Sequence, residues 1–239
     1  MYKRILLKLS GEALKEGMKD SILNPENVAT IARAIKTLTD SGIQVAIVCG
    51  AGNIWRGKLA QEIGFDRVSA DYMGMLGTVI NAVALSSSLK TIGVDSVVFS
   101  PISPINGVVE EYNADRADEV LSQNKVAFLA GGTGKPYFTT DTAATLRAIE
   151  TKCDAIFVAK NGVDGLYDDD PNKNPNAKFI KEITYKEIIQ LKLQVMDLSA
   201  IELLLDKDIE IRIFSMADFS NFEKIAAGED VGSVCKKGN

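Results

Sequence analysis

The stretch Ala130-Gly-Gly-Thr-Gly-Lys-Pro-Tyr-Phe-Thr-Thr-Asp141 organises the rest of this 239-residue chain. It follows a short apolar run, Val126–Leu129, and leads into a helical pattern, Thr142–Ile149. A strand, a glycine-rich turn and a helix start together form an anion site. Glycines let backbone N–H groups approach a phosphate, and the helix dipole favours negative charge there. Three threonine hydroxyls and one lysine add donors, so the sequence predicts that Thr133–Thr140 holds a phosphorylated small molecule.

Two familiar phosphate motifs fail in this chain. A P-loop needs G-x-x-x-x-G-K-[ST], but around Gly134-Lys135 the first glycine position is Leu129 and the hydroxyl position is Pro136. The dinucleotide fingerprint G-x-G-x-x-G also fails, because Gly50-Ala51-Gly52 is followed by Trp55 where the third glycine should stand. The alternative for residues 130–141 is an ordinary βα loop with incidental glycines, which any α/β protein can contain.

Length and composition are those of a soluble globular protein. A chain of 239 residues fits one large domain, or one domain with a subdomain, and can bury a substantial core. The net charge of -5 argues against a nucleic-acid platform, since no basic stripe dominates. Anionic ligands stay possible because a site can be locally positive. The absence of histidine excludes imidazole acid/base chemistry and histidine metal ligation.

Cysteine and acidic residues give no protein-held metal site. Cys49, Cys153 and Cys235 are widely spaced and odd in number, which suits a reducing cytoplasm and offers no C-x-x-C pair. The consecutive acids Asp168–Asp170 could be read as a metal site. Three neighbouring side chains do not face one point, however, so a solvated turn is the better interpretation.

The beginning of the chain predicts a strand. Met1–Leu9 briefly resembles a signal peptide, but its apolar segment is short and Lys8 interrupts it. No run reaches the roughly 18 apolar residues that a membrane span requires. We therefore expect a cytoplasmic protein with neither a membrane nor a nucleic acid as partner.

Strands and helices alternate along the chain. The predicted strands are Arg4–Leu9, Gln44–Cys49, Val94–Ser100, Val126–Ala130, Ala155–Ala159, Glu210–Phe214 and Ser233–Lys236. The predicted helices are one that Asn24-Pro25 begins and Gly42 ends, then Ser69–Thr91, Asn113–Gln123, Thr142–Ile149, Thr184–Leu191, Ser199–Asp206 and Phe219–Ala227. This alternation predicts an α/β fold with a mostly parallel central sheet covered on both faces. There is no internal repeat, low-complexity tract or clear inter-domain linker, so we expect a single domain over residues 1–239.

Three of the predicted strands end in glycine-bearing turns: Ser10-Gly11, Gly50–Gly52 and Gly131–Gly134. The carboxyl ends of parallel strands lie at one edge of a sheet, where α/β proteins bind ligands. The three turns can therefore face one another across a single crevice.

Charged side chains beside these turns are candidates for phosphate and sugar contacts, and each has a simpler alternative. Lys8 precedes the first turn and could reach a phosphate, or could be a snorkelling lysine at a strand end. Arg56 could pair bidentately with phosphate oxygens, or be a solvated loop arginine. Asp71 could accept sugar hydroxyls, or act as a helix-terminus carboxylate. In the same helix Gly74 and Gly77 permit close approach of another backbone or a ligand.

Five segments match a known family. In chain order they are Lys8-Leu-Ser-Gly-Glu-Ala13, Gly50-Ala-Gly-Asn-Ile-Trp-Arg-Gly57, Asp71-Tyr-Met-Gly-Met75, Gly132-Thr-Gly-Lys-Pro-Tyr-Phe-Thr-Thr-Asp141 and Val195-Met-Asp197. Together they resemble the bacterial uridylate kinases (UMP kinases) of the amino acid kinase superfamily, colinearly over nearly the whole chain. The resemblance implies a three-layer α/β/α sandwich, a cytoplasmic homohexamer, and the reaction UMP + ATP → UDP + ADP with Mg²⁺ in pyrimidine nucleotide biosynthesis.

The resemblance also implies roles for individual residues. The residues implied for ATP are Lys8, Leu9, Ser10, Gly11, Gly52, Arg56, Asn161, Tyr167 and Asp170, the last three at the nucleoside end. The residues implied for UMP are Ala51 at its phosphate, Asp71 at its ribose, and Thr133, Gly134, Lys135, Pro136, Tyr137, Phe138, Thr139 and Thr140 around it. The implied catalytic residues are Lys8, Arg56 and Asp141, of which Asp141 would orient the lysine or the metal. Lys160 is a weaker candidate for a second donor-side cation.

The chain departs from the family pattern at two places. Ala51 stands where the family usually has a glycine, which puts a methyl group near the acceptor phosphate while leaving its backbone N–H available. The stretch Glu16–Ile22 lacks the Phe/Gly-rich form that carries GTP-activator contacts in many relatives, so GTP activation stays open. Feedback inhibition by UTP is an expectation from the family alone.

The chemistry implied for this site needs little acid/base help. The acceptor phosphate is already a dianion near neutral pH, so positioning and charge stabilisation do most of the work. Lys8, Arg56, Mg²⁺ and the N–H groups of Gly11, Gly52 and Gly132 would together offset the repulsion between two anionic substrates. Two other functions stay open: a kinase that makes an acyl phosphate on aspartate, glutamate or carbamate, and a nucleotide-sensing module without turnover.

Overall fold

Three apolar strands form the centre of the fold: β1 (Arg4–Leu9), β2 (Gln44–Cys49) and β6 (Ala155–Lys160). β1 pairs in parallel with both of the others. A strand covered on both faces must be apolar at nearly every position, and these three are buried almost throughout. The computed structural model describes residues 2–102, 104–160, 162–216, 218 and 220–238.

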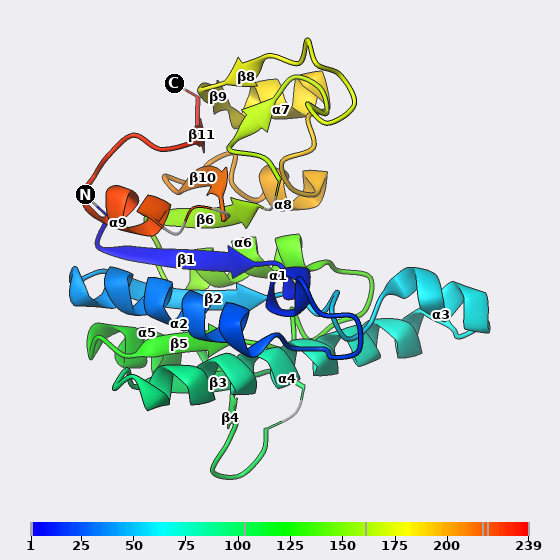
Figure 1. The fold of residues 1–239 in the computed structure, drawn as a ribbon, viewed down its shortest axis with the longest axis vertical. Helices are drawn as coiled ribbons and strands as arrows, with labels where there is room; N and C mark the ends of the chain where they lie inside the picture. Colours follow the sequence, from blue (N-terminus) through cyan, green and yellow to red (C-terminus); the bar gives the residue numbers. More distant parts are fainter. Residues whose placement is uncertain (1, 103, 161, 217, 219, 239) are drawn as a thin grey trace.

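Within the described residues, nine strands form one sheet (Figure 1). Side by side they run β4 (Glu110–Glu111), β3 (Ser96–Ser100), β5 (Val126–Leu129), β2, β1, β6, β10 (Glu210–Ser215), β11 (Ser233–Lys236) and β9 (Glu182–Thr184). The pairing between β10 and β11 is antiparallel, and the other pairings in this sheet are parallel. A separate antiparallel pair joins β7 (Leu166–Tyr167) to β8 (Phe179–Ile180). The predicted mostly parallel sheet is confirmed.

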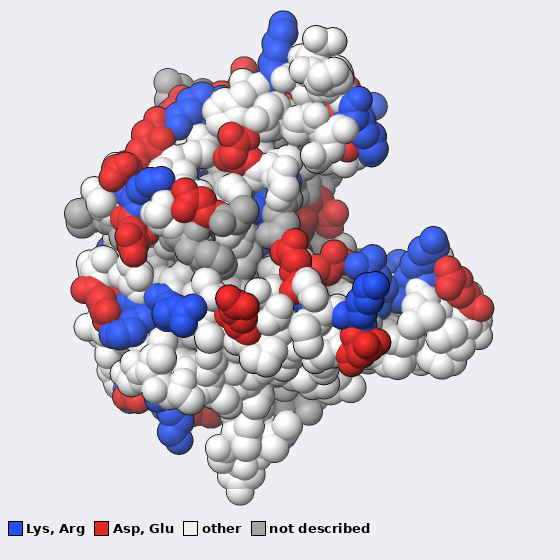
Figure 2. All heavy atoms as spheres, viewed as in Figure 1, with Lys and Arg blue, Asp and Glu red and all other residues white. Residues whose placement is uncertain are grey.

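The surface is hollowed at the side toward which the arrowheads of β1, β2 and β6 point (Figures 1 and 2). In this part of the structure α3 (Gly57–Ile63) projects away from the sheet, and β7, β8 and α7 (Tyr185–Leu191) lie on the other side of the notch. Lysine, arginine, aspartate and glutamate side chains gather around its rim (Figure 2). The notch therefore lies at the carboxyl edge of the central strands, where the sequence predicts the ligand.

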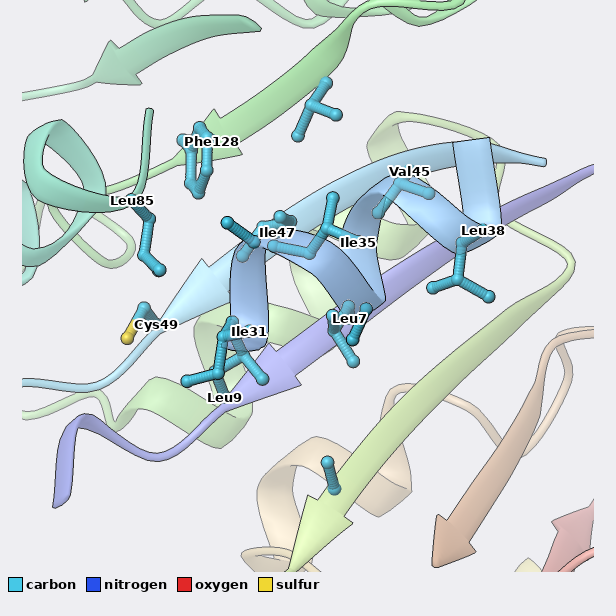
Figure 3. Close-up of a cluster of buried hydrophobic side chains, with 14 of the residues drawn as sticks. Leu7, Leu9, Ile31, Ile35, Leu38, Val45, Ile47, Cys49, Leu85 and Phe128 are labelled. Carbon is cyan, nitrogen blue, oxygen red and sulfur yellow. The ribbon is translucent and has the colours of Figure 1, made fainter. Parts of the chain in front are cut away.

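Helices cover both faces of the sheet. Besides α3, which projects from the sheet, the helices of the described residues are α1 (Gly11–Lys15), α2 (Pro25–Asp40), α4 (Arg67–Thr91), α5 (Ala114–Ser122), α6 (Thr140–Glu150), α7, α8 (Leu198–Glu202) and α9 (Ser220–Ala226). One buried cluster joins α2, α4 and α9 to the sheet, and Figure 3 shows part of it, where Ile35 of α2 lies beside Ile47 of β2. A second cluster joins α5, α6, α7 and α8 to the opposite face. The two clusters make the predicted three layers.

Several predicted helix starts are confirmed by their caps. The Asn24 side chain accepts from the N–H of Glu26, and Pro25 opens α2. Thr184 and Glu187 form a reciprocal capping box at α7. A polar side chain at these positions satisfies backbone N–H groups that have no partner within the helix. The predicted start of the last helix, Phe219, lies outside the described residues.

By length and composition, α4 is apolar enough to cross a membrane, although its apolar residues do not form one uninterrupted run. Core helices of soluble proteins pass the same test. Ala82, Leu85 and Leu89 of this helix are buried in the cluster shared with α2. α4 thus packs one face into the core, and 44% of its most apolar 18-residue window is buried.

Two helices were not predicted from the sequence, α1 and α3. α1 follows β1 directly, where the sequence predicted only the Ser10-Gly11 turn. α3 buries only Ala60, so it has no periodic apolar face that a pattern could reveal.

Candidate active site

The turns after β1 and β2 lie against each other. The strands end in register, with Leu9 opposite Cys49. A Cβ atom placed on Gly11 would collide with the carbonyl oxygen of Gly50 and lie 2.6 Å from Oδ1 of Asn53, so only glycine allows this approach. A Cβ on Gly50 would lie 3.8 Å from Oγ1 of Thr140. The first two glycine turns and the start of α6 therefore meet at one place, as the sequence predicts.

The turn after β5 is fixed by its glycines and by α4. Gly131, Gly132 and Gly134 have φ of 73°, 61° and 79°, a region that residues with a Cβ rarely adopt. The N–H of Gly131 donates to Oγ1 of Thr78 over 2.8 Å, so the turn is bonded directly to α4. The third glycine turn is thereby brought to the same edge of the sheet as the other two.

A cavity of about 430 Å³ lies between the β2 turn, α4 and the β5 turn. Its lining includes these residues predicted to bind UMP: Ala51, Asp71, Thr133, Phe138, Thr139 and Thr140. The lining also includes Gly52, Trp55 and Phe65, so one wall is aromatic. The remaining residues of the predicted set, Gly134, Lys135, Pro136 and Tyr137, lie in the same loop but are not part of the lining.

Asp71 connects α4 to the β5 loop. Its Oδ2 accepts the backbone N–H of Tyr137 over 2.7 Å, and both oxygens accept from Nε of Arg67 at 2.8 and 2.9 Å. Tyr137 has a φ of 72°, which is uncommon for a residue with a side chain. A carboxylate held in this way faces the cavity with a fixed orientation and is placed to accept hydroxyl donors from a ligand.

Lys8 forms a close ion pair with Asp141, and each side chain is 20% exposed. The second oxygen of Asp141 accepts the N–H of Asp197 over 3.2 Å. Asp141 stands in the first turn of α6, whose N-cap is Thr139. The Val195–Asp197 segment thus holds the aspartate, and the aspartate holds the lysine beside the glycine turns.

Lys160, at the end of β6, places another cation near this ion pair. Burial lowers the pKa of Lys160, and the positive charge of Lys8 lowers it further, while Asp141 acts in the opposite direction. The Nζ atom donates to the carbonyl of Gln194 over 3.3 Å. Since Lys160 also lines the neighbouring hollow, it connects the two regions.

That second hollow, of about 460 Å³, includes Tyr167 and Asp170, two of the residues predicted for the nucleoside end of ATP. Lys173 pairs with Asp170 at 3.0 Å, and hydrogen bonds with Lys173 and the N–H of Asn172 lower the pKa of the Asp170 carboxyl. The hydroxyl of Tyr167 donates to Asp164 over 2.8 Å. The third predicted residue, Asn161, lies outside the described residues.

The three consecutive acids do not converge. Asp168 accepts from the N–H of Lys178, Asp169 accepts from Asn174, and Asp170 pairs with Lys173. The part of the chain that the structure describes contains no group of three or more His, Cys, Asp or Glu residues that could hold a metal ion.

Arg56 lines a different hollow from Asp71. Its guanidinium forms a close ion pair with Glu12, and its Nε donates to the carbonyl of Gly52 over 3.3 Å. Its side chain is 64% exposed and lines a third hollow of about 560 Å³. Gly52 lines both this hollow and the cavity beside Asp71, so Arg56 is adjacent to the cavity without facing it.

Sequence reasoning missed a buried arginine behind the β5 turn. Arg147 is 4% exposed, and its Nη2 donates to the carbonyl of Gly132 over 3.0 Å. Its Nη1 pairs with Glu150 at 2.6 Å, and its guanidinium lies 3.7 Å from the centre of the Tyr112 ring. The sequence does contain one indication of this burial. Arg147 lies three and four residues after Ala144 and Ala143, on the apolar face of the helix.

The arrangement can hold two anionic groups close together. Glycine turns offer backbone N–H groups at one edge, a lysine held by an aspartate supplies a cation, and separate hollows flank them. Such a combination favours phosphate groups and stabilises charge that develops during their transfer.

Comparison with known proteins gives a consistent family. A model of the amino acid kinase family matches residues 3–215. The chain is similar to the uridylate kinase of Mesoplasma florum, with 47% identity over 227 residues, 95% of this chain and 94% of that one. It is 46% identical over 233 residues to a uridylate kinase of Streptococcus thermophilus, covering 98% of this chain and 94% of the other.

Solved structures agree. The crystal structure of UMP kinase from Bacillus anthracis matches with a TM-score of 0.95 and 39% identity, covering 100% of this chain and 97% of that one. The structure of UMP kinase from Ureaplasma parvum matches with a TM-score of 0.92 and 36% identity, over 99% of this chain and 100% of the other.

Proposed function

This chain belongs to the amino acid kinase family, and from that premise we propose that it is a uridylate kinase. It transfers the γ-phosphoryl group of ATP to UMP, giving UDP and ADP. Its similarity to uridylate kinases over nearly its whole length supports this substrate pair. The reaction is a step in making pyrimidine nucleotides, and we place the protein in the cytoplasm.

One observation carries the choice of acceptor. Asp71 and the Thr133–Thr140 loop line the same cavity and are bonded to each other through the N–H of Tyr137. A carboxylate suited to sugar hydroxyls thus lies opposite a loop with threonine hydroxyls, and Trp55 and Phe138 add aromatic surface. A cavity of about 430 Å³ with this lining suits a nucleoside monophosphate better than aspartate, glutamate or carbamate.

The residues fit a transfer between two phosphates without a strong base. An oxygen of the UMP phosphate attacks the γ-phosphorus, the bond from that phosphorus to ADP breaks, and no proton must move first. Lys8 and the N–H groups of Gly11 and Gly52 stabilise the negative charge of the transferring phosphoryl group. Asp141 holds Lys8 in place through their ion pair. Arg56 would add its charge only after leaving Glu12.

Magnesium enters as the partner of ATP. Mg²⁺ bound mainly by substrate phosphates and water needs only one or two protein carboxylates. Asp141 is a carboxylate beside Lys8, so the residues fit the ion. When bound, the ion supplies neutralisation of phosphate charge, while Asp141 orients either the lysine or the ion's water shell.

The remaining residues are assigned to the two nucleotides. For ATP we propose Leu9 and Ser10 with the residues above at the phosphates, and Asn161, Tyr167 and Asp170 at the nucleoside. For UMP we propose Ala51 at the phosphate and Gly134, Lys135, Pro136, Thr139 and Thr140 in the enclosing loop. UTP, which shares the base and ribose of UMP, is expected to inhibit.

We also propose a homo-oligomer, with a hexamer as the family-level expectation. Val68, Tyr72, Leu76 and Ile80 follow one another at every fourth position of α4, and all four are exposed. This spacing makes one continuous apolar stripe on a helix surface, which a second copy of the chain can cover. Light scattering on the purified protein tests this, and a strictly monomeric mass would contradict it.

An acceptor panel tests the function. Purified protein is given ATP, Mg²⁺ and one of UMP, CMP, glutamate or carbamate, and ADP release is followed by a coupled assay. We expect the largest kcat/KM with UMP. Turnover confined to glutamate or carbamate would assign an acyl-phosphate kinase. Binding of UMP or UTP without ADP release would assign a nucleotide sensor.

A further inference from the structure

One face of α4 contacts the turn after β2 (Gly50–Trp55) at four positions. Ala70 accepts the indole N–H of Trp55 over 2.9 Å, and a Cβ on Gly74 would lie 3.7 Å from Cδ1 of Trp55. Further along, Gly77 and Asn81 meet the first residues of the turn. The positions 70, 74, 77 and 81 are spaced by four, three and four residues, so they form a single stripe.

Asn81 forms the polar part of this contact. It is completely buried, and its Nδ2 donates to the carbonyl of Gly50 and to Oδ1 of Asn53, both over 2.8 Å. Its Oδ1 accepts from Nδ2 of Asn53 over 2.9 Å, which makes the amide pair reciprocal. The Asn53 amide also donates to the carbonyl of Ile22 over 2.7 Å. The turn is therefore fixed to α4 by bonds that cannot be replaced by water without opening the core.

Gly77 forms the apolar part. A Cβ atom at this position would lie 2.8 Å from Cβ of Ala51 and 3.6 Å from Cβ of Ile54. The Ala51 methyl group is attached directly to the turn's backbone and has no torsion by which it could move aside. The methyl group thus points to α4, and Ala51 also lines the cavity between this turn and the helix.

A neighbouring stripe on the same helix holds the other turn. Asp71 accepts the N–H of Tyr137, and Thr78 accepts the N–H of Gly131. A Cβ on Gly132 would lie 3.4 Å from Cγ of Met75. Positions 71, 75 and 78 each lie one residue after positions 70, 74 and 77 of the first stripe. The turns after β2 and β5 therefore pack side by side on the same helix.

We propose that α4 is the element that sets the spacing between the two phosphate-facing turns, with Gly77 and Asn81 as positioning residues for the UMP phosphate. This inference rests on the proposed function, because it takes the acceptor cavity as the UMP site. Neither residue touches substrate; each acts through the backbone of Gly50–Asn53. Small displacements of this backbone misalign the N–H groups that face the phosphate, and misalignment of reacting groups slows catalysis strongly.

A two-residue exchange tests the apolar contact. Gly77→Ala pushes the turn after β2 away from α4, so we expect KM for UMP to rise about tenfold. We expect KM for ATP to rise less than about threefold, because the nucleoside end of ATP is assigned to the second hollow, which contains Tyr167 and Asp170. A tenfold change corresponds to about 1.4 kcal/mol. Adding Ala51→Gly removes the opposing methyl group, so the double variant should recover most of the loss. Ser87→Ala, an exposed change on the same helix, is the matched control.

Asn81→Ala gives a second test that does not depend on the first variant folding. It leaves the Gly50 carbonyl and the Asn53 amide without their partner, and we expect KM for UMP to rise at least fivefold. Thermal unfolding of every variant is measured alongside. A purely structural role predicts lowered stability with equal changes for both substrates, and no recovery in the double variant.

The outcomes separate this inference from the proposed function. Wild-type protein that releases no ADP with UMP overturns both. Wild-type turnover with UMP, together with unchanged KM values in Gly77→Ala and Asn81→Ala, overturns the inference alone. A double variant no better than Gly77→Ala also overturns it.

Discussion

Replacing Lys8 by alanine is the perturbation with the clearest expected size. Lys8 pairs with Asp141, and both side chains are 20% exposed, so the pair is largely shielded from bulk water. The aspartate is held in turn by the N–H of Asp197 over 3.2 Å. The lysine cation is therefore placed before the substrates arrive, and its loss removes a stabilising charge that water cannot replace at the same position.

The magnitude follows from this environment. A unit cation about 4 Å from a unit negative charge gains about 1 kcal/mol in bulk water and about 4 kcal/mol at an effective dielectric constant of about 20. Partial burial favours the larger figure. Removing one transition-state donor from an enzyme costs about 2.7–4 kcal/mol, or about 10² to 10³ in kcat. We expect Lys8→Ala to lower kcat by that factor, with a smaller change in KM for UMP.

The assay is coupled ADP release at saturating UMP and ATP. Lys90→Ala, at the far end of α4 and exposed, is the control for loss of a surface lysine. If Asp141 acts mainly through Lys8, adding Asp141→Asn to Lys8→Ala should lower kcat less than about threefold further, since the two act as one unit. A kcat within about threefold of wild type for Lys8→Ala would refute the assignment of this lysine.

Three further predictions concern separate features. Burial lowers the pKa of Lys160, so this lysine loses its positive charge at a lower pH than an ordinary lysine does. We therefore expect kcat/KM for ATP to fall on the alkaline side, and this fall to move to higher pH in Lys160→Arg. Identical pH profiles for the two proteins would contradict this. Burial raises the pKa of the thiols of Cys49, Cys153 and Cys235 to about 12. An aromatic disulfide reagent at pH 8 should therefore label none of the three in the native protein and all of them after denaturation. Rapid labelling of the native protein would be inconsistent with their burial. Arg147→Met should lower the free energy of unfolding, measured by urea titration, by about 2 kcal/mol. This is less than the roughly 3–5 kcal/mol for breaking a fully buried ion pair, because Glu150 is partly exposed. A loss under about 0.5 kcal/mol would show that the turn at Gly132 does not need the hydrogen bond from Arg147.

The parts of the fold that the sequence predicted are those set by local patterns. Arg4–Leu9 and Gln44–Cys49 are apolar runs that end in glycine turns, and parallel pairing places such ends at one edge. Gly77 is unusual within a helix, and the structure shows that the group close to it is the side chain of Ala51, not the backbone or ligand that the sequence predicted. Caps at Asn24 and Thr184 likewise depend on neighbours only two or three residues away.

The parts that escaped prediction depend on residues far apart in the chain. Asn81 joins a turn 28–31 residues earlier, and nothing in its local sequence distinguishes it from an ordinary helix asparagine. Arg56 forms an ion pair with Glu12, 44 residues earlier in the chain. The loop sequence alone therefore could not predict that the Arg56 side chain lies outside the cavity. α3 buries a single residue and gives no periodic signal. Such contacts are decided by packing of distant elements and need the folded chain.

The most direct measurement of the central claim is a crystal structure of the protein with UMP and a non-hydrolysable ATP analogue. We expect the UMP phosphate against the N–H group of Ala51, and the terminal phosphate of the analogue beside Lys8 and the N–H group of Gly52. The attacking oxygen should lie within about 3.5 Å of the terminal phosphorus. Phosphates held in separate hollows that do not face each other would contradict it.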